Sequence, residues 1–154
     1  MAAFFSDSSA LAKVYVVETG SAWMRALLPP ATANEMFVSR ISSVEVAAAL
    51  ARRVRAGSLS ATDAQQGVTT LRADFGATYR IIEVTIPMVE HALQLTQTYA
   101  LRAYDAMQLA AALLLAGERS AAGMNLPIFL CSDAQLTSAA ASEGLAVDDP
   151  NLHP

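Results

Sequence analysis

Four acidic residues stand where their carboxylates could be brought together. Asp7 and Asp133 each follow a short apolar run directly, Glu45 comes shortly after another such run, and Asp105 opens a long alanine-rich stretch. Carboxylate oxygens are the hard ligands that Mg²⁺ and Mn²⁺ prefer in proteins. Without a cation, four clustered carboxylates would repel one another and raise some of their pKa values. A shared metal site is therefore one interpretation of this pattern.

Helix capping is the other interpretation. Asp7, Asp105 and Asp133 each precede a predicted helix, where aspartate is a favoured N-cap. Ser42-x-x-Glu45 has the form of a capping box, in which the glutamate bonds back to the start of its own helix. For any one acid alone, capping is the favoured explanation, and spacing along the chain cannot show that the four converge.

The elements that would position these acids alternate between short strands and helices. Expected strands cover residues 2–6, 36–41, 80–85, 128–132 and 145–147. Expected helices cover residues 7–16, 20–28, 42–56, 60–77, 87–99, 105–118 and 134–143. Uninterrupted apolar strands separated by helices predict an α/β fold, with a parallel sheet covered on both faces.

Ligands of such sheets bind in the crevice beyond the carboxyl ends of the strands. Asp7 and Asp133 directly follow predicted strands, and Glu45 lies one turn into the helix after another. Asp105 is the exception, because it lies between two predicted helices. Three of the four acids are thus expected at the edge where a ligand would bind.

Length and composition limit the class of protein. The 154 residues suit a single domain over 1–154, and no run is long enough to span a membrane. One cysteine, Cys131, excludes a disulfide framework and favours the cytoplasm. The low charged share of 16% favours a homodimer or another partner that covers apolar surface. The net charge of −4 neither supports nor excludes a nucleic-acid substrate, since four acids in one metal site would account for it.

Four segments together resemble the PIN-domain family, and in particular the VapC-type ribonuclease toxins of bacterial toxin–antitoxin pairs. They are residues 5–15, 42–50, 101–112 and 129–136, and the tail 139–147 also fits. The likeness follows the whole chain in order. It implies a PIN-like three-layer α/β/α sandwich with a central, mainly parallel sheet of four to five strands.

The resemblance also implies a function and a set of roles. The family's acidic quartet corresponds to Asp7, Glu45, Asp105 and Asp133, which would use Mg²⁺ or Mn²⁺ to hydrolyse RNA phosphodiester bonds. Asp7 and Asp133 would bind metal directly and Asp105 directly or through water, while Glu45 would orient or deprotonate the attacking water or complete the coordination. A cognate antitoxin would place a segment in a groove near the site and hold the enzyme inactive.

Three further residues are candidates for substrate binding. Ser9 corresponds to the family's hydroxyl beside the first acid. Lys13 is either a phosphate contact or a solvated helix residue, and Arg102 either faces the cleft or pairs with an acid. Cys131 stands where many relatives have threonine, and a thiol is a poorer hydrogen-bond donor, so the support of Asp133 is in question.

Two other classes of protein remain as alternatives. A PIN-like domain can act without catalysis, as a regulatory module that binds RNA or protein, although a complete quartet argues against this. A phosphoaspartate receiver domain also clusters acids beyond parallel strands. The position of Asp133 and the lack of a conventional lysine after the last strands count against that class.

Overall fold

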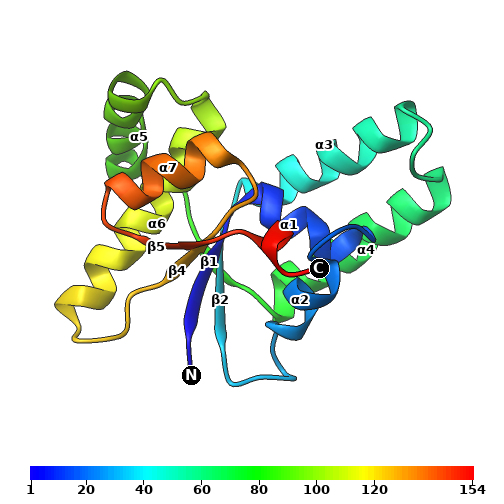
Figure 1. The fold of residues 1–154 in the computed structure, drawn as a ribbon, viewed down its shortest axis with the longest axis horizontal. Helices are drawn as coiled ribbons and strands as arrows, with labels where there is room; N and C mark the ends of the chain where they lie inside the picture. The colour runs from blue at the N-terminus through cyan, green and yellow to red at the C-terminus, as the bar shows by residue number, and fades with distance from the viewer.

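The computed structural model describes residues 1–154 and has a central sheet with helices on both faces (Figure 1). The strands are β1 (Ala3–Ser6), β2 (Glu35–Ser39), β3 (Arg80–Ile82), β4 (Ile128–Leu130) and β5 (Ala146–Asp148). The helices are α1 (Ser8–Tyr15), α2 (Ser21–Ala26), α3 (Ser42–Arg55), α4 (Ala61–Ala77), α5 (Ile86–Tyr99), α6 (Ala103–Ala121), α7 (Ala134–Ser142) and the 3₁₀ turn η1 (Pro150–Leu152).

The sheet has the strand order β3-β2-β1-β4-β5, and all four strand pairs are parallel. The chain moves outward from β1 to β3 and then returns through α5 and α6 to place β4 on the other side of β1. The order therefore reverses between β1 and β4, which is where open α/β sheets bind ligands. The predicted parallel sheet of four to five strands is confirmed.

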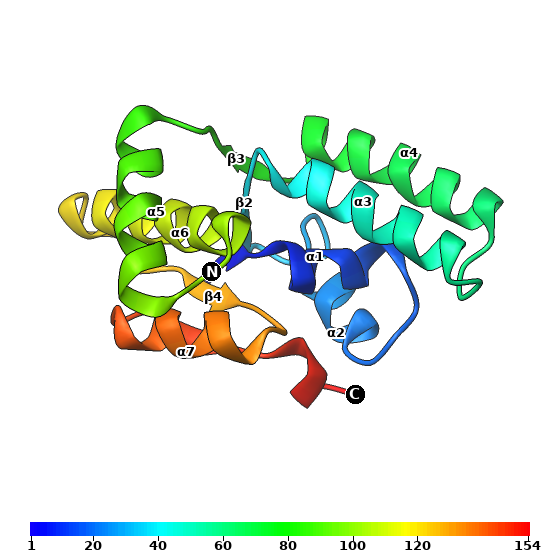
Figure 2. The ribbon, with the colours of Figure 1, turned by 90° about the horizontal axis from the view of Figure 1, so that it is seen from above.

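Alternating side chains of the strands build two separate cores. Phe5 and Phe129 face α5, α6 and α7, and their rings stack with centroids 5.8 Å apart. Phe4 and Leu130 face α1 to α4 on the opposite side. Seen from above, the two groups of helices lie on the two sides of the sheet (Figure 2). A strand buried on both faces needs apolar residues at every position, which explains the uninterrupted apolar runs.

The third strand is shorter than predicted. It ends at Ile82, whereas an apolar run through Thr85 was expected to stay extended. Thr85 instead caps α5, with its hydroxyl accepting from the Met88 amide, and Pro87 occupies the first turn of that helix. β3 is an edge strand with one neighbour, so there is little to hold the additional residues in the sheet.

The two helices α3 and α4 pack against each other and project beyond the sheet as an arm (Figures 1 and 2). Ser60 caps α4 by accepting from the Asp63 amide, as its sequence predicts, and Gly57 takes a left-handed φ of 76° at the turn between the helices. None of the helices has both the length and the apolar character that crossing a bilayer requires.

Candidate active site

A cleft of about 350 Å³ opens beyond the carboxyl end of the sheet, and all four predicted acids line it. Asp7 comes from the end of β1, Glu45 from α3, Asp105 from α6 and Asp133 from the loop after β4. The wall also includes Ser9 and the arginines Arg52, Arg53 and Arg102. The fold thus brings the acids of four distant segments into one place.

Asp7 is the most deeply buried of these acids, with 3% of its surface exposed. It is also the N-cap of α1, since its carboxylate accepts from the Ala10 amide at 3.0 Å. Burial raises its pKa to about 6, although hydrogen bonds from Ala10 and Ser9 act in the opposite direction. Asp7 therefore both caps α1 and lines the acidic cleft.

Ser9 connects the ends of β1 and β4. Its hydroxyl donates to Asp7 Oδ1 at 2.8 Å and accepts from the Ser132 amide at 2.9 Å. These bonds fix the Asp7 carboxylate relative to the loop that carries Asp133. Ser9 lines the cleft as predicted, and its observed contacts are with Asp7 and Ser132.

Asp133 caps α7 and remains exposed at the rim of the cleft. Its carboxylate accepts from the Leu136 amide at 2.9 Å. The fully buried Cys131 supports the turn through the backbone, because its sulfur accepts from the Asp133 amide at 3.3 Å. The thiol therefore makes a backbone contact at the position where a threonine was expected in the family.

The predicted capping box at Ser42 is wrong. Ser42 is the first residue of α3, the N-cap is Ile41, and no side chain caps this helix. The Ser42 hydroxyl is buried and accepts from Gln108 Nε2 at 2.9 Å, while Glu45 Oε1 accepts from the same nitrogen at 2.7 Å. The two side chains that were expected to cap this helix therefore bind Gln108 of the distant helix α6 instead.

Gln108 is the residue of this site that the sequence analysis missed. Only 1% of its surface is exposed, and its amide nitrogen also lies 2.8 Å from Ser8 Oγ. An ionised carboxylate accepts only, so the amide must turn its nitrogen toward Glu45. Gln108 therefore fixes Glu45 from α6, one turn after Asp105.

Asp105 lies in the first turn of α6 and is not its N-cap, a position that Arg102 occupies. The capping explanation therefore fails for this acid. Its pKa is raised, mainly by burial and then by the charge of Asp133, while Arg102 lowers it. Both carboxylates line the cleft, where their like charges repel.

The donor set suits a hard divalent cation. Carboxylate oxygens dominate the cleft. The raised pKa values of Asp7 and Asp105 mean that their charged forms are disfavoured, and a bound cation would stabilise those charged forms. No three acidic, histidine or cysteine side chains are grouped so as to hold one ion between them. Mg²⁺ usually takes one or two carboxylates together with water and substrate oxygens, so the arrangement fits such an ion.

Comparison with known proteins identifies the family. The model of the PIN domain family matches residues 4–119. The chain belongs to the PIN domain family. Two relatives from Mycobacterium tuberculosis, named Ribonuclease VapC45 and Ribonuclease VapC49, are each 36% identical over 109 residues, which is 71% of this chain and 74% of theirs. The resemblance to VapC-type proteins is confirmed.

Solved structures of low sequence identity share the fold. VapC20 of M. tuberculosis, described as a sarcin-ricin loop cleaving toxin, superposes with a TM-score of 0.63 at 16% identity, covering 98% of this chain and 99% of that one. A toxin–antitoxin complex from Klebsiella pneumoniae gives 0.61 at 19% identity, covering 96% and 97%. The PIN-like three-layer architecture is therefore confirmed over nearly the whole chain.

Of two predicted substrate-binding residues of this PIN domain, one lines the cleft and the other does not. Arg102 is exposed on the wall of the cleft beside Asp105. Lys13 does not line the cleft: it is 5% exposed, and its ammonium donates to Glu18 Oε1, Thr19 O and Asn151 Oδ1 at 2.8–3.2 Å. All three ammonium hydrogens are used, so Lys13 joins α1 to the C-terminal turn η1.

Lys13→Met is expected to lower the free energy of unfolding by about 2–3 kcal/mol, since hydrogen bonds to a charged group contribute about 1.5–3 kcal/mol. Methionine keeps most of the apolar stem, and Glu18 keeps Arg53 as its partner. Urea denaturation would measure the change, with the exposed Arg55→Met as control, expected within about 0.5 kcal/mol of wild type. Unchanged stability together with weaker RNA binding would restore the phosphate-contact interpretation.

Proposed function

We propose that this PIN domain is a metal-dependent endoribonuclease, the toxin of a toxin–antitoxin pair. The observation that carries the proposal is the convergence of Asp7, Glu45, Asp105 and Asp133 on one cleft. The names of the VapC relatives support RNA as the substrate. Mg²⁺ or Mn²⁺ is the proposed cofactor because hard oxygen ligands dominate the cleft.

In the proposed mechanism, Asp7 and Asp133 would hold the metal from the ends of the adjacent strands β1 and β4, and Asp105 would bind it directly or through water. A divalent ion at this place supplies Lewis-acid stabilisation of the phosphate charge and makes water more acidic. Glu45, fixed by Gln108, orients the attacking water or accepts its proton. Ser9 keeps Asp7 in position for these contacts.

The proposal is tested with the purified protein and total RNA, with Mg²⁺ or Mn²⁺ added or removed by a chelator. We expect cleavage at defined sites that stops with the chelator, returns with the metal and is lost in Asp105→Asn. Sequencing of the RNA ends would locate the cuts. Failure of every metal to support cleavage would contradict the proposal and favour a non-catalytic PIN-like domain that binds RNA or protein.

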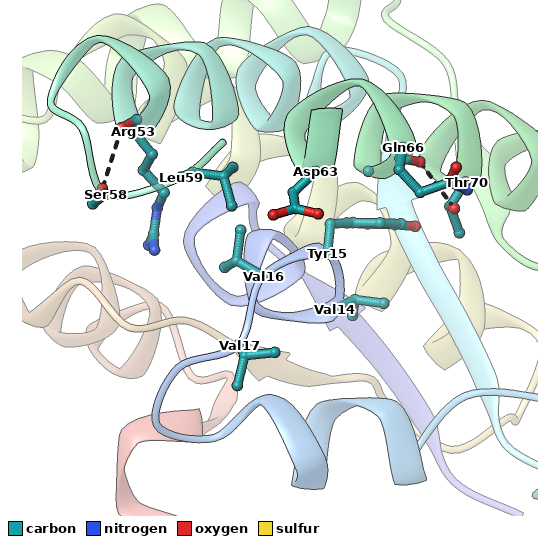
Figure 3. Close-up of a pocket in the computed structure, with 11 residues that line it drawn as sticks. Val14, Tyr15, Val16, Val17, Arg53, Ser58, Leu59, Asp63, Gln66 and Thr70 are labelled. Carbon is teal, nitrogen blue, oxygen red and sulfur yellow. Dashed lines mark hydrogen bonds between the residues drawn. The ribbon is translucent and has the colours of Figure 1, made fainter. Parts of the chain in front are cut away.

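The proposed antitoxin has a suitable groove beside the acidic cleft. A hollow of about 570 Å³ lies between the end of α1 and the α3–α4 arm, and Figure 3 shows Val14, Val16 and Leu59 around it. Arg53 lines both this hollow and the acidic cleft. An amphipathic antitoxin segment in the hollow would cover the partly exposed Val14 and Leu59 and the exposed Val17, and would reach the acids along Arg53.

A homodimer is proposed on the basis of exposed apolar residues of α5. Ile86, Val89 and Leu93 recur at helical spacing and are 80%, 43% and 52% exposed. A contiguous apolar helix face commonly marks an interface. Light scattering on the purified protein would measure the mass, and a monomer at micromolar concentration would contradict this assignment.

A further inference from the structure

A second groove, of about 550 Å³, continues from the acidic cleft between α3 and the start of α6. The two hollows share Glu45, Arg52, Arg102 and Asp105 in their walls. Both helices begin near the middle of the sheet edge, as Figure 2 shows from above. A polymer with one phosphate in the cleft would therefore have its next unit in this groove.

Tyr104, at the start of α6, lines the groove. Its side chain is 60% exposed, and it forms no hydrogen bond and no aromatic contact within the chain. Val44 of α3, which is 68% exposed, lies in the opposite wall. An aromatic ring and an aliphatic side chain across a groove can hold a flat ring between them.

Two arginines line both this groove and the acidic cleft. Arg52 and Arg102 are exposed, and neither guanidinium forms a hydrogen bond or an ion pair, in contrast to Arg53, which pairs with Glu18. Guanidinium groups without a carboxylate partner are suited to phosphate oxygens, which they bind with two parallel hydrogen bonds. The groove therefore combines two guanidinium groups that have no ion-pair partner with an exposed aromatic ring, directly beside the acidic cleft.

We propose that this groove is a nucleoside subsite, in which an unpaired base next to the scissile phosphate stacks on Tyr104 while Arg52 and Arg102 contact the flanking phosphates. The inference rests on the proposed ribonuclease function and adds the choice of single-stranded RNA. A duplex keeps its bases stacked inside the helix, so only an unstacked nucleotide can present its face to Tyr104. A protein segment is less suited to a groove whose free charges are arginines close to the acids that the metal would occupy.

The test uses a short oligoribonucleotide copied from a cut site mapped in total RNA, and a series in which each base in turn is replaced by an abasic residue. Tyr104→Ala is expected to raise KM for the intact oligomer about tenfold, because stacking on an aromatic side chain contributes about 1–3 kcal/mol per base. Tyr104→Phe keeps the ring and should behave as wild type. Arg52→Gln should also raise KM, whereas Arg55→Gln on the same helix, away from the groove, should not.

The abasic series identifies the stacked base. One abasic oligomer, altered beside the cut, should raise KM for the wild type about as much as Tyr104→Ala does, and the two changes together should add little. If Tyr104→Ala has the KM of the wild type on every oligomer that the wild type cleaves, the subsite is overturned and the ribonuclease function stands; a groove that binds a protein partner predicts this result. The subsite is likewise overturned if the effect of Tyr104→Ala adds fully to that of every abasic position. A wild type that cleaves no RNA would overturn the proposed function and the subsite with it.

Discussion

Asp7→Asn is expected to abolish RNA cleavage and, at the same time, to make the metal-free protein more stable at neutral pH. The loss of activity should be at least about a hundredfold, because a neutral amide replaces the buried carboxylate that would hold the metal from β1. The gain in stability follows from the burial of Asp7, which is 3% exposed, because the hydrogen bonds from Ala10 and Ser9 offset only part of the cost of burying its charge. Function and stability thus make opposite demands on this residue.

The size of the stability gain follows from the pKa of Asp7. Burial raises it from 3.8 to about 6, so between these values the folded protein binds more protons than the unfolded chain. Stability therefore falls as the pH rises through this window, and above about pH 6 the full penalty of about 3 kcal/mol is present. Asparagine avoids ionisation but rearranges the bond to Ser9, so a net gain of about 1–2 kcal/mol is expected.

Thermal unfolding of the metal-free proteins at neutral pH and near pH 4 would measure this effect. The difference between Asp7→Asn and wild type should shrink at the lower pH, where Asp7 is protonated. Asp133→Asn is the matched control, since Asp133 is exposed and asparagine is an equally good N-cap. It should lose cleavage and gain much less stability, because it relieves only the repulsion between Asp133 and Asp105. A destabilised Asp7→Asn would contradict the assigned charge penalty.

Gln108→Leu is expected to lower kcat about 10- to 100-fold with a small change in KM. The substitution removes the 2.7 Å bond to Glu45 and the contacts to Ser8 and Ser42. A hydrogen bond to a charged group contributes about 1.5–3 kcal/mol, and its loss frees Glu45 to leave its orientation toward the attacking water. Gln97→Leu, on the exposed surface of α5, should leave the kinetics unchanged.

Gln108→Glu separates positioning from a general effect on folding. Two carboxyl groups at this short distance would repel, which raises the pKa of the pair. The pH profile of kcat should therefore shift to higher pH in Gln108→Glu, with activity recovering as the pair ionises. A structural defect would scale kcat equally at every pH, and that result would remove Gln108 from the positioning of Glu45.

Much of the fold follows from local patterns. Phe4 and Phe5 lie in one apolar run because β1 is covered on both faces, and Ser60 and Asp133 each cap the helix that follows them. These features depend on residues within one turn or one strand of each other. For the same reason, the placement of Asp7 and Asp133 beyond the carboxyl ends of their strands was predictable once the sheet was taken as parallel, whereas the adjacency of β1 and β4 was not.

Other features of the site depend on contacts between distant segments. Ser42 and Glu45 satisfy the capping-box pattern, but Gln108 of α6 offers both of them a buried donor, and that contact replaces the local one. A single polar residue inside the apolar run of α6, one turn from Asp105, was the available signal. Lys13 carried no such signal, because its burial depends on Asn151, 138 residues away, in addition to the nearby Glu18 and Thr19.

The sequence by itself determined the elements, the parallel sheet and which acids stand at its edge, since hydrophobic period, caps and strand ends are local properties. Only the tertiary structure decided what each polar side chain bonds to. Glu45 accepts a hydrogen bond from Gln108, and Lys13 donates to Glu18 and Asn151. Arg52 and Arg102 line the groove beside Tyr104 without a hydrogen-bond partner. Burial makes an unpaired polar group costly, and packing decides which partner is within reach.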